Sequence, residues 1–155
     1  MRPRDAATLI IIRDDREVLL GVRTAHHVFM PHCYVFPGGR VDPGESVEQA
    51  ALRELEEEVD LRLDSGSVLG RLDDYATRSG YVITPVVVWG GSNVELTPNP
   101  GEVDLVHRIP LNELMRDDAP ILESIAGSEH PVLKCRSATN GLPPPVLLSP
   151  TSFAR

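Results

Sequence analysis

The clearest chemical feature of the chain is a run of carboxylates in the hexapeptide RELEEE, residues 53–58. Glu54, Glu57 and Glu58 stand at positions i, i+3 and i+4, so on a helix their side chains share one face. Three oxygen donors on one rigid face suit a hard divalent cation such as Mg²⁺, which binds through a few carboxylates together with substrate phosphates. Glu56 points to another side of the helix and is expected to face solvent.

A helix must position these carboxylates, and the flanking residues predict one. Ser46 and Gln49, three positions apart, form a capping box at its start, and good helix formers continue to about Val59. An apolar row recurs every four residues, at Val47, Ala51, Leu55 and Val59. This row is expected to bury the side of the helix opposite the carboxylates.

The loop before the helix is expected to close over the acidic face. Pro37-Gly38-Gly39 lets the backbone approach the helix, so that carbonyl oxygens can join a metal shell. Glu45 lies eight residues before Arg53, a spacing at which the loop can fold back and pair them. We expect Arg53 to contact Glu45 rather than its neighbours in the helix. Without such a loop, an acidic helix face is usually only a solvated surface.

The remaining segments predict a mixed α+β sandwich around this helix. Strands are expected over 6–13, 17–22, 34–37, 67–76, 80–90 and 103–110, and a short helix over 111–117. Pro85, inside one of these strands, predicts a sheet edge or a bulge. The prolines of residues 140–152 predict an extended, weakly packed tail.

Length and charge restrict the remaining possibilities. The 155 residues fit a single domain over residues 1–155, with a core of about 6–117 and a proline-rich tail of about 131–155. The 23 Asp and Glu residues outnumber the 15 Lys and Arg, which argues against nucleic-acid or anionic-membrane binding. No segment approaches the roughly 18 apolar residues of a membrane span, and the N-terminus resembles a strand rather than a signal peptide. We expect a cytoplasmic protein.

Cysteine and histidine usage offers little chemistry. Cys33 and Cys135 lack CxxC spacing, so they predict reduced thiols. His26, His27 and His32 have neither a ligand-like cysteine partner nor helical HxxxH spacing. They therefore favour loop or substrate-edge roles over a zinc site.

The segment GRVDPGESVEQAALRELEEEVDL, residues 39–61, resembles the Nudix box, G-x5-E-x7-R-E-U-x-E-E-x-G-U, in which U is aliphatic. Eight of the nine fixed positions match, namely Gly39, Glu45, Arg53, Glu54, Leu55, Glu57, Glu58 and Leu61. Asp60 replaces the box glycine directly after the helix, where a left-handed residue is favoured. Because Asp tolerates that conformation, we expect a modest loss of stability rather than of catalysis.

The resemblance implies a Nudix-type α/β/α sandwich with a mixed sheet. It also implies Mg²⁺-dependent hydrolysis of a nucleoside diphosphate linked to another moiety, with Mn²⁺ as an alternative ion. It assigns Glu54, Glu57 and Glu58 as metal ligands, with the Gly38 carbonyl as a further one. Arg53, Glu54 and Glu57 are the catalytic candidates within the box.

Other roles follow from the same resemblance. Arg53 and Glu45 would orient the loop, and Gly39 would have a structural role. The general base is either a box glutamate or a residue of a distant loop. Glu102, in NPGEVD, is the candidate for the distant position, with Glu95 second. An ordinary surface acid is the alternative for Glu102.

Three further segments resemble coenzyme A diphosphatases: LLGVRTA (19–25), SGYVITPVVV (79–88) and PNPGEVDLVHRIPLNEL (98–114). The interval from Arg23 to Phe36 is longer than that signature expects, and the glycine before the FPGG strand is absent. Coenzyme A or an acyl derivative is thus one candidate substrate, while ADP-ribose, dinucleoside polyphosphates and oxidised nucleotides stay open. Arg23 could contact a phosphate or form a surface salt bridge.

The expected partner is therefore a small nucleotide diphosphate, not a nucleic acid or a membrane. A homodimer stays open, because relatives dimerise but no exposed apolar stripe demands it. A Nudix-like ligand sensor or interaction module without turnover is the alternative class. The intact Arg53, Glu54, Glu57 and Glu58 count against a sensor, and only Asp60 counts for it.

Overall fold

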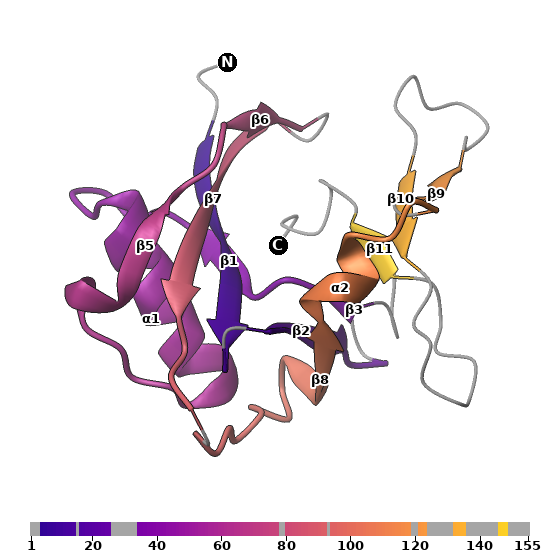
Figure 1. Cartoon of the computed structure of the whole chain (residues 1–155). Helices are drawn as coiled ribbons and strands as arrows, with labels where there is room; N and C mark the ends of the chain where they lie inside the picture. The colour runs from indigo at the N-terminus through magenta and orange to yellow at the C-terminus, as the bar shows by residue number, and fades with distance from the viewer. Residues whose placement is uncertain are drawn as a thin grey trace.

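The computed structural model describes residues 4–14, 16–25, 34–77, 80–92, 94–118, 121–123, 132–135 and 146–148. Eight of the strands in these ranges form one sheet (Figure 1). Its central order is β3 (Tyr34–Val35), β2 (Glu17–Arg23), β1 (Arg4–Arg13), β7 (Tyr81–Trp89) and β5 (Val68–Arg71). Three further strands pair with this path: β4 (Gly38–Arg40) with β1, β6 (Tyr75–Ala76) with β7, and β8 (Val103–Pro110) with β2.

The sheet is mixed, as the sequence predicts. β1 and β7 run parallel along their whole shared length, from Arg4 opposite Tyr81 to Ile12 opposite Trp89. The other strand pairs are antiparallel. The α+β class is therefore confirmed.

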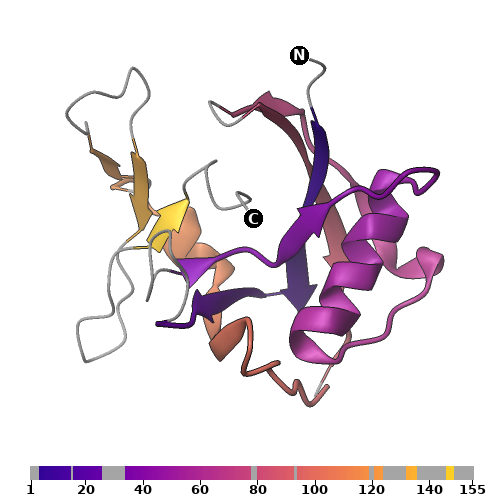
Figure 2. The ribbon, with the colours of Figure 1, turned by 180° about the vertical axis from the view of Figure 1, so that it is seen from behind.

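Helices lie on both faces of this sheet. Helix α1 (Val47–Val59) buries Ala51, Leu55 and Val59 in one core cluster with Leu9 and Leu19 of the sheet. Figure 2 shows this helix beside the sheet from behind. On the other face, Leu114 of the short helix α2 (Leu111–Leu114) packs against a second cluster of Leu20 and Ile109. The neighbours Leu19 and Leu20 thus face opposite cores, as the alternation along a strand requires.

Two details of the sheet differ from the sequence prediction. Pro85 does not mark an edge, because β7 has neighbours on both sides. The interruption lies in the partner instead: β5 ends at Arg71 and β6 begins at Tyr75, and between them Leu72 N–H donates to Pro85 O at 2.9 Å. Since proline has no N–H, a continuous partner would gain no hydrogen bond from it. The predicted strand over 67–76 is broken for this reason.

The second difference is a strand that the sequence interpretation missed. The glycines of residues 38–40 form β4, which pairs antiparallel with Ala6–Thr8 of β1. A Cβ at Gly38, whose φ is +151°, would overlap the Ala7 carbonyl. Glycine is therefore required for the close approach of the two backbones.

The described C-terminal residues form a small antiparallel sheet of β9 (Ile121–Glu123), β10 (Val132–Cys135) and β11 (Val146–Leu148). β11 falls inside the predicted extended tail, and its three residues are extended. Most of the tail, together with Cys33, His26, His27 and His32, lies outside the described residues. None of the described helices is long and apolar enough to cross a membrane.

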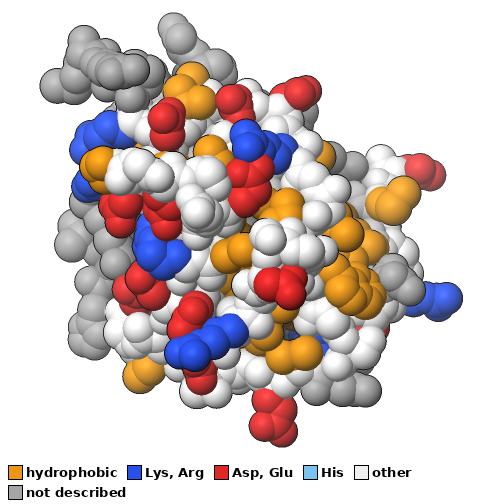
Figure 3. Space-filling model, turned by 90° about the vertical axis from the view of Figure 1, so that its left-hand side faces the viewer, with side chains coloured by type: hydrophobic (Ala, Val, Ile, Leu, Met, Phe, Trp, Pro, Cys, Tyr) orange, Lys and Arg blue, Asp and Glu red, His pale blue; other side chains and the backbone are white. Residues whose placement is uncertain are grey.

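On the face that Figure 3 shows, acidic side chains lie next to basic ones and apolar side chains gather in a patch. The exposed large apolar residues of the described chain include Leu69, Leu72, Tyr75, Leu105 and Met115.

Strand β1 ends in a buried charge. Arg13 is 0% exposed, and its backbone pairs across the sheet with Glu17 of β2. Its Nε, Nη1 and Nη2 atoms have no hydrogen-bond partner among the described residues. A guanidinium removed from water without a partner opposes folding.

Candidate active site

Helix α1 begins and ends where the sequence predicts. Gln49 N–H donates to Ser46 Oγ at 3.1 Å, and Ser46 N–H donates to Gln49 Oε1 at 2.8 Å, which completes the capping box. At the other end Asp60 has φ 55° and ψ 33°, the left-handed conformation expected at the substituted box position. The predicted bounds of the helix that carries the carboxylates are thus confirmed.

Arg53 joins the helix to the loop before it. Its Nε donates to Glu45 Oε1 at 3.0 Å and its Nη2 donates to Glu45 Oε2 at 3.1 Å. Nη2 also donates to the Arg40 carbonyl at 2.9 Å. The predicted pairing of Glu45 with Arg53 is confirmed, and its two parallel hydrogen bonds fix both side chains in one plane.

The prediction that Arg53 turns away from its own helix is wrong. Its Nη1 donates to Glu54 Oε1 at 2.8 Å and to Glu57 Oε2 at 3.3 Å. A guanidinium carries five N–H groups in a fork, so it can bind Glu45 with one edge and still reach its helix neighbours with Nη1. Arg53 therefore holds two of the candidate metal ligands as well as the loop.

Gly39, which has no side chain, leaves space for the Glu54 carboxylate. A Cβ on Gly39 would overlap the Oε1, Cδ and Oε2 atoms of Glu54. The Glu54 side chain is only 14% exposed, whereas Glu57 is 53% exposed. The box glycine thus makes room for a buried carboxylate between β4 and α1. Gly38 lies one residue earlier in β4.

Charges around Glu54 act on its protonation. Burial raises the pKa of Glu54 above its ordinary value, against the hydrogen bond from Arg53, and the charges of Glu57 and Glu102 add to the rise. In contrast, the hydrogen bond from Arg53 lowers the pKa of Glu45.

The donor set fits a hard divalent cation in its chemistry. Glu54 and Glu57 are carboxylates of one helix that share a hydrogen-bond donor, Arg53 Nη1, and oxygen donors of this kind are the ligands that Mg²⁺ takes. Among the described residues, no three or more His, Cys, Asp or Glu side chains are already arranged to hold a metal ion. Arg53 Nη1 binds one oxygen of each carboxylate, Glu54 Oε1 and Glu57 Oε2, so an ion would take the second oxygen of each.

The other predicted residues belong to β2, to α1 and to the segment between β7 and β8. Arg23 is the last residue of β2, and its side chain is not among those that the structure describes. Glu95 is exposed in the segment between β7 and β8. Glu58 belongs to α1, and its side chain is half-buried.

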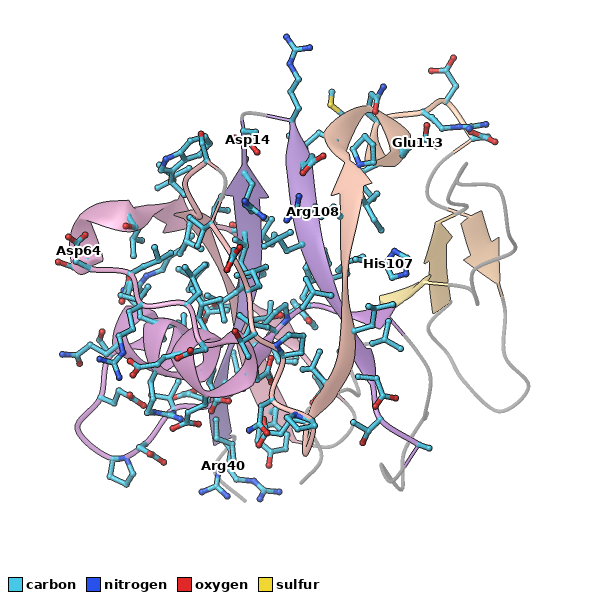
Figure 4. All side chains as sticks on the ribbon, turned by 90° about the horizontal axis from the view of Figure 1, so that it is seen from below. Asp14, Arg40, Asp64, His107, Arg108 and Glu113 are labelled. Atoms are coloured by element: carbon cyan, nitrogen blue, oxygen red, sulfur yellow. The ribbon has the colours of Figure 1, made fainter. Side chains whose placement is uncertain are left out.

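The structure also adds residues that the sequence reasoning did not select. The Arg40 carbonyl is a partner of Arg53, and the Arg40 side chain is exposed. Figure 4 shows Arg40 beside α1, on the side of the molecule away from Asp14 and Glu113. Asn99 contacts the end of α1 as well. The turn-forming sequence PNPGE was the only available signal for Asn99.

These features define a class of protein: a mixed sheet with an acidic helix, tied by arginine to a glycine-rich loop. Residues 2–126 match the family model of the NUDIX domain. The chain therefore belongs to the Nudix hydrolase family. The matched region includes the expected core of residues 6–117 and stops before the proline-rich tail.

The chain is similar to the "Uncharacterized Nudix hydrolase NudL" of Yersinia pestis (strain Pestoides F). The two are 38% identical over 115 residues, which are 72% of this chain and 58% of the relative. The chain thus spans somewhat more than half of the length of the curated relatives that it matches.

Solved structures agree with the family. The MutT NUDIX hydrolase from Burkholderia pseudomallei superposes with a TM-score of 0.56 at 28% identity, over 72% of this chain and 86% of that chain. A bifunctional NMN adenylyltransferase/ADP ribose pyrophosphatase from Francisella tularensis, complexed with AMP and a Mn ion, gives a TM-score of 0.56 at 22% identity. That match covers 72% of this chain and 35% of the other, and at such identity it supports the fold alone.

Proposed function

We propose that this chain is a divalent-metal-dependent diphosphohydrolase that cleaves the diphosphate of a nucleoside diphosphate linked to another moiety. The observation that carries the proposal is the Arg53 network, which joins the loop residue Glu45 to Glu54 and Glu57. Such a network holds carboxylates on a rigid helix while leaving Glu57 accessible from solvent. Membership of the Nudix hydrolase family supports the same activity.

The proposed ion is Mg²⁺, with Mn²⁺ as an alternative. Glu54, Glu57 and Glu58 would hold it, and the Gly38 carbonyl is a further candidate ligand. When bound, such an ion neutralises the diphosphate and lowers the pKa of a water molecule. An acidic protein of net charge −8 can then bind an acidic substrate, because the cation lies between them.

The residues of the chain would divide the remaining work. Glu45 keeps Arg53 oriented through two hydrogen bonds, and Arg53 keeps Glu54 in the space beside Gly39. Glu102 is our candidate for accepting a proton from the attacking water, because its backbone bonds to Asn99, which in turn bonds to the end of α1. A box glutamate is the alternative base.

Substitution of Glu57 tests the site. Glu57→Gln preserves the shape of the side chain and removes its charge, so we expect kcat to fall by a factor of about 10² or more. Glu56→Gln is a matched control, since Glu56 lies in the same helix but outside the Arg53 network. Full kcat for Glu57→Gln at saturating Mg²⁺ would show that the site assignment is wrong.

Coenzyme A or an acyl derivative is the substrate that we propose to test first, with ADP-ribose, NADH and diadenosine polyphosphates beside it. The support is the likeness of residues 19–25, 79–88 and 98–114 to coenzyme A diphosphatases. We expect one substrate to exceed the others in kcat/KM by at least about tenfold. Equal, slow turnover of the whole panel would place the physiological substrate outside it.

A further inference from the structure

Asn99 connects the helix of the candidate active site to the loop that carries Glu102. It lies between β7 and β8, 42 residues after Glu57 in the chain. Its backbone and its side chain each form hydrogen bonds to two segments, the C-terminal end of α1 and the loop that leads to Glu102.

The contacts with α1 satisfy carbonyl groups at the end of the helix. Asn99 N–H donates to Glu58 O at 2.8 Å, and Asn99 Nδ2 donates to Glu57 O at 3.3 Å. The last carbonyls of a helix have no partner within it, so they must find donors elsewhere. Here Asn99 donates to the carbonyls of two candidate metal ligands, while Thr97 N–H donates to the carbonyl of Val59.

The contacts along the loop fix the backbone of Glu102. Glu102 N–H donates to the Asn99 carbonyl at 2.9 Å, and Val103 N–H donates to the same oxygen at 2.8 Å. The amide of Gly101 donates to Asn99 Oδ1 at 3.1 Å. The single side-chain amide of Asn99 therefore donates to the helix with its nitrogen and accepts from the loop with its oxygen.

We propose that Asn99 is a positioning residue, which holds Glu102 at a fixed place relative to Glu57 and Glu58. The role in turnover rests on the proposed hydrolase function, in which Glu102 accepts a proton. The mechanical role does not, because it concerns only the bonds between α1 and the loop. The two roles can therefore be tested separately.

Amide hydrogen exchange in the metal-free protein tests the mechanical role. Asn99→Ala removes both side-chain bonds, so exchange at Gly101 and Glu102 should accelerate about tenfold. Thr97→Ala is the matched control, because Thr97 bonds to Val59 O through its backbone and its side chain is exposed. Unchanged exchange at both amides in a folded Asn99→Ala protein would overturn the proposal.

Kinetics test the role in turnover. Asn99→Ala should lower kcat about tenfold to a hundredfold with KM changed less than about threefold, since misplacement of a reacting group acts on the chemical step. Asn99→Asp keeps the acceptor for Gly101 and loses the donor to Glu57, so its kcat should lie between those of Asn99→Ala and the unsubstituted protein. Thr97→Ala should keep the original kcat.

A double-mutant cycle separates positioning of Glu102 from general loosening of the loop. In a Glu102→Gln background, Asn99→Ala should lower kcat by less than about twofold, because the group that it positions is already inactive. An equal loss in both backgrounds would overturn the proposal while leaving the hydrolase function intact. Absence of hydrolysis in the unsubstituted protein would instead reject the proposed function, and the exchange measurement would still decide the positioning.

Discussion

Two arginines of this protein occupy opposite situations. Arg53, on the surface of α1, is 30% exposed and donates to Glu45, Glu54, Glu57 and the Arg40 carbonyl. Arg13, at the end of β1, is 0% exposed and has no hydrogen-bond partner among the described residues. The same type of side chain thus stabilises one region and opposes folding in another.

The difference shows what makes a charged side chain useful. The acceptors around Arg53 come from the loop, from the helix and from β4, so its bonds connect three segments. The bonds raise the pKa of Arg53 further and keep it charged. Arg13 loses its water and gains no such bonds from the described residues, so its burial opposes folding.

Loss of Arg53 should have the largest effect. We expect Arg53→Met to lower kcat by about 10² or more and the free energy of unfolding by about 2 kcal/mol, because Glu45 and Glu54 lose a charged partner. Turnover with Mg²⁺ and urea unfolding measure the two effects. Arg53→Lys is the control for charge, since lysine cannot form the two parallel bonds to Glu45. A lysine variant with full activity would show that charge alone suffices.

Filling the space that the Glu54 carboxylate occupies should have the next largest effect. The Cβ of Gly39→Ala would overlap the Glu54 carboxylate, so Glu54 must leave its bond with Arg53. We expect kcat to fall about tenfold and Mn²⁺ to bind more weakly in calorimetry. Gly70→Ala is the matched control, because a Cβ there meets nothing within 4 Å. Equal effects of the two alanines would contradict the role of Gly39.

Removal of the buried charge should act in the opposite direction. We expect Arg13→Met to leave the free energy of unfolding unchanged or to raise it by up to about 2 kcal/mol, because an apolar side chain of similar volume replaces an unpaired charge. Urea unfolding beside Arg53→Met gives the direct comparison. If Arg13→Met lowered the free energy of unfolding by more than about 1 kcal/mol, Arg13 would stabilise the fold and the contrast with Arg53 would be wrong.

A third arginine, Arg71, forms an exposed ion pair, and loss of this pair should have the smallest effect on stability. Its hydrogen bond to Glu48 lowers the pKa of that carboxyl from its ordinary value of 4.5. Since the folded-state pKa is the lower one, the pair stabilises the protein above pH 4.5 and loses this contribution as the pH falls through the folded-state value. Glu48→Gln should cost a few tenths of a kcal/mol at pH 7, and this difference should shrink in acid. A difference independent of pH in urea unfolding would exclude the ion pair as its cause.

Local patterns were enough to predict much of the site. The capping box at Ser46, the left-handed residue at Asp60 and the pairing of Glu45 with Arg53 each depend on residues within the segment 45–60. The mixed α+β class also followed from the order of strand-like and helical segments. Hydrogen bonds between near neighbours in a helix or cap have few alternatives, so the residue types alone restrict them strongly.

Other features depended on segments far apart in the chain. Of the two alternatives at Pro85, the edge was wrong because it depended on which strand lies beside β7, whereas the register of β5 against β7 does shift, between Val68 and Gly70. The glycines of β4 were taken only for a loop. The second set of bonds from Arg53, to Glu54 and Glu57, depended on the side-chain rotamer. Neither the pairing of distant strands nor a rotamer has a short-range signature.

The sequence by itself determined which carboxylates are the candidates for the chemistry, because the spacing of Glu54, Glu57 and Glu58 on a capped helix predicts one shared face. Only the tertiary structure decided what surrounds them. It placed Gly39 against Glu54 and attached the loop through Asn99 to the carbonyls of α1. Asn99 and Glu57 are 42 positions apart, and such contacts are fixed by how the sheet folds rather than by local propensity.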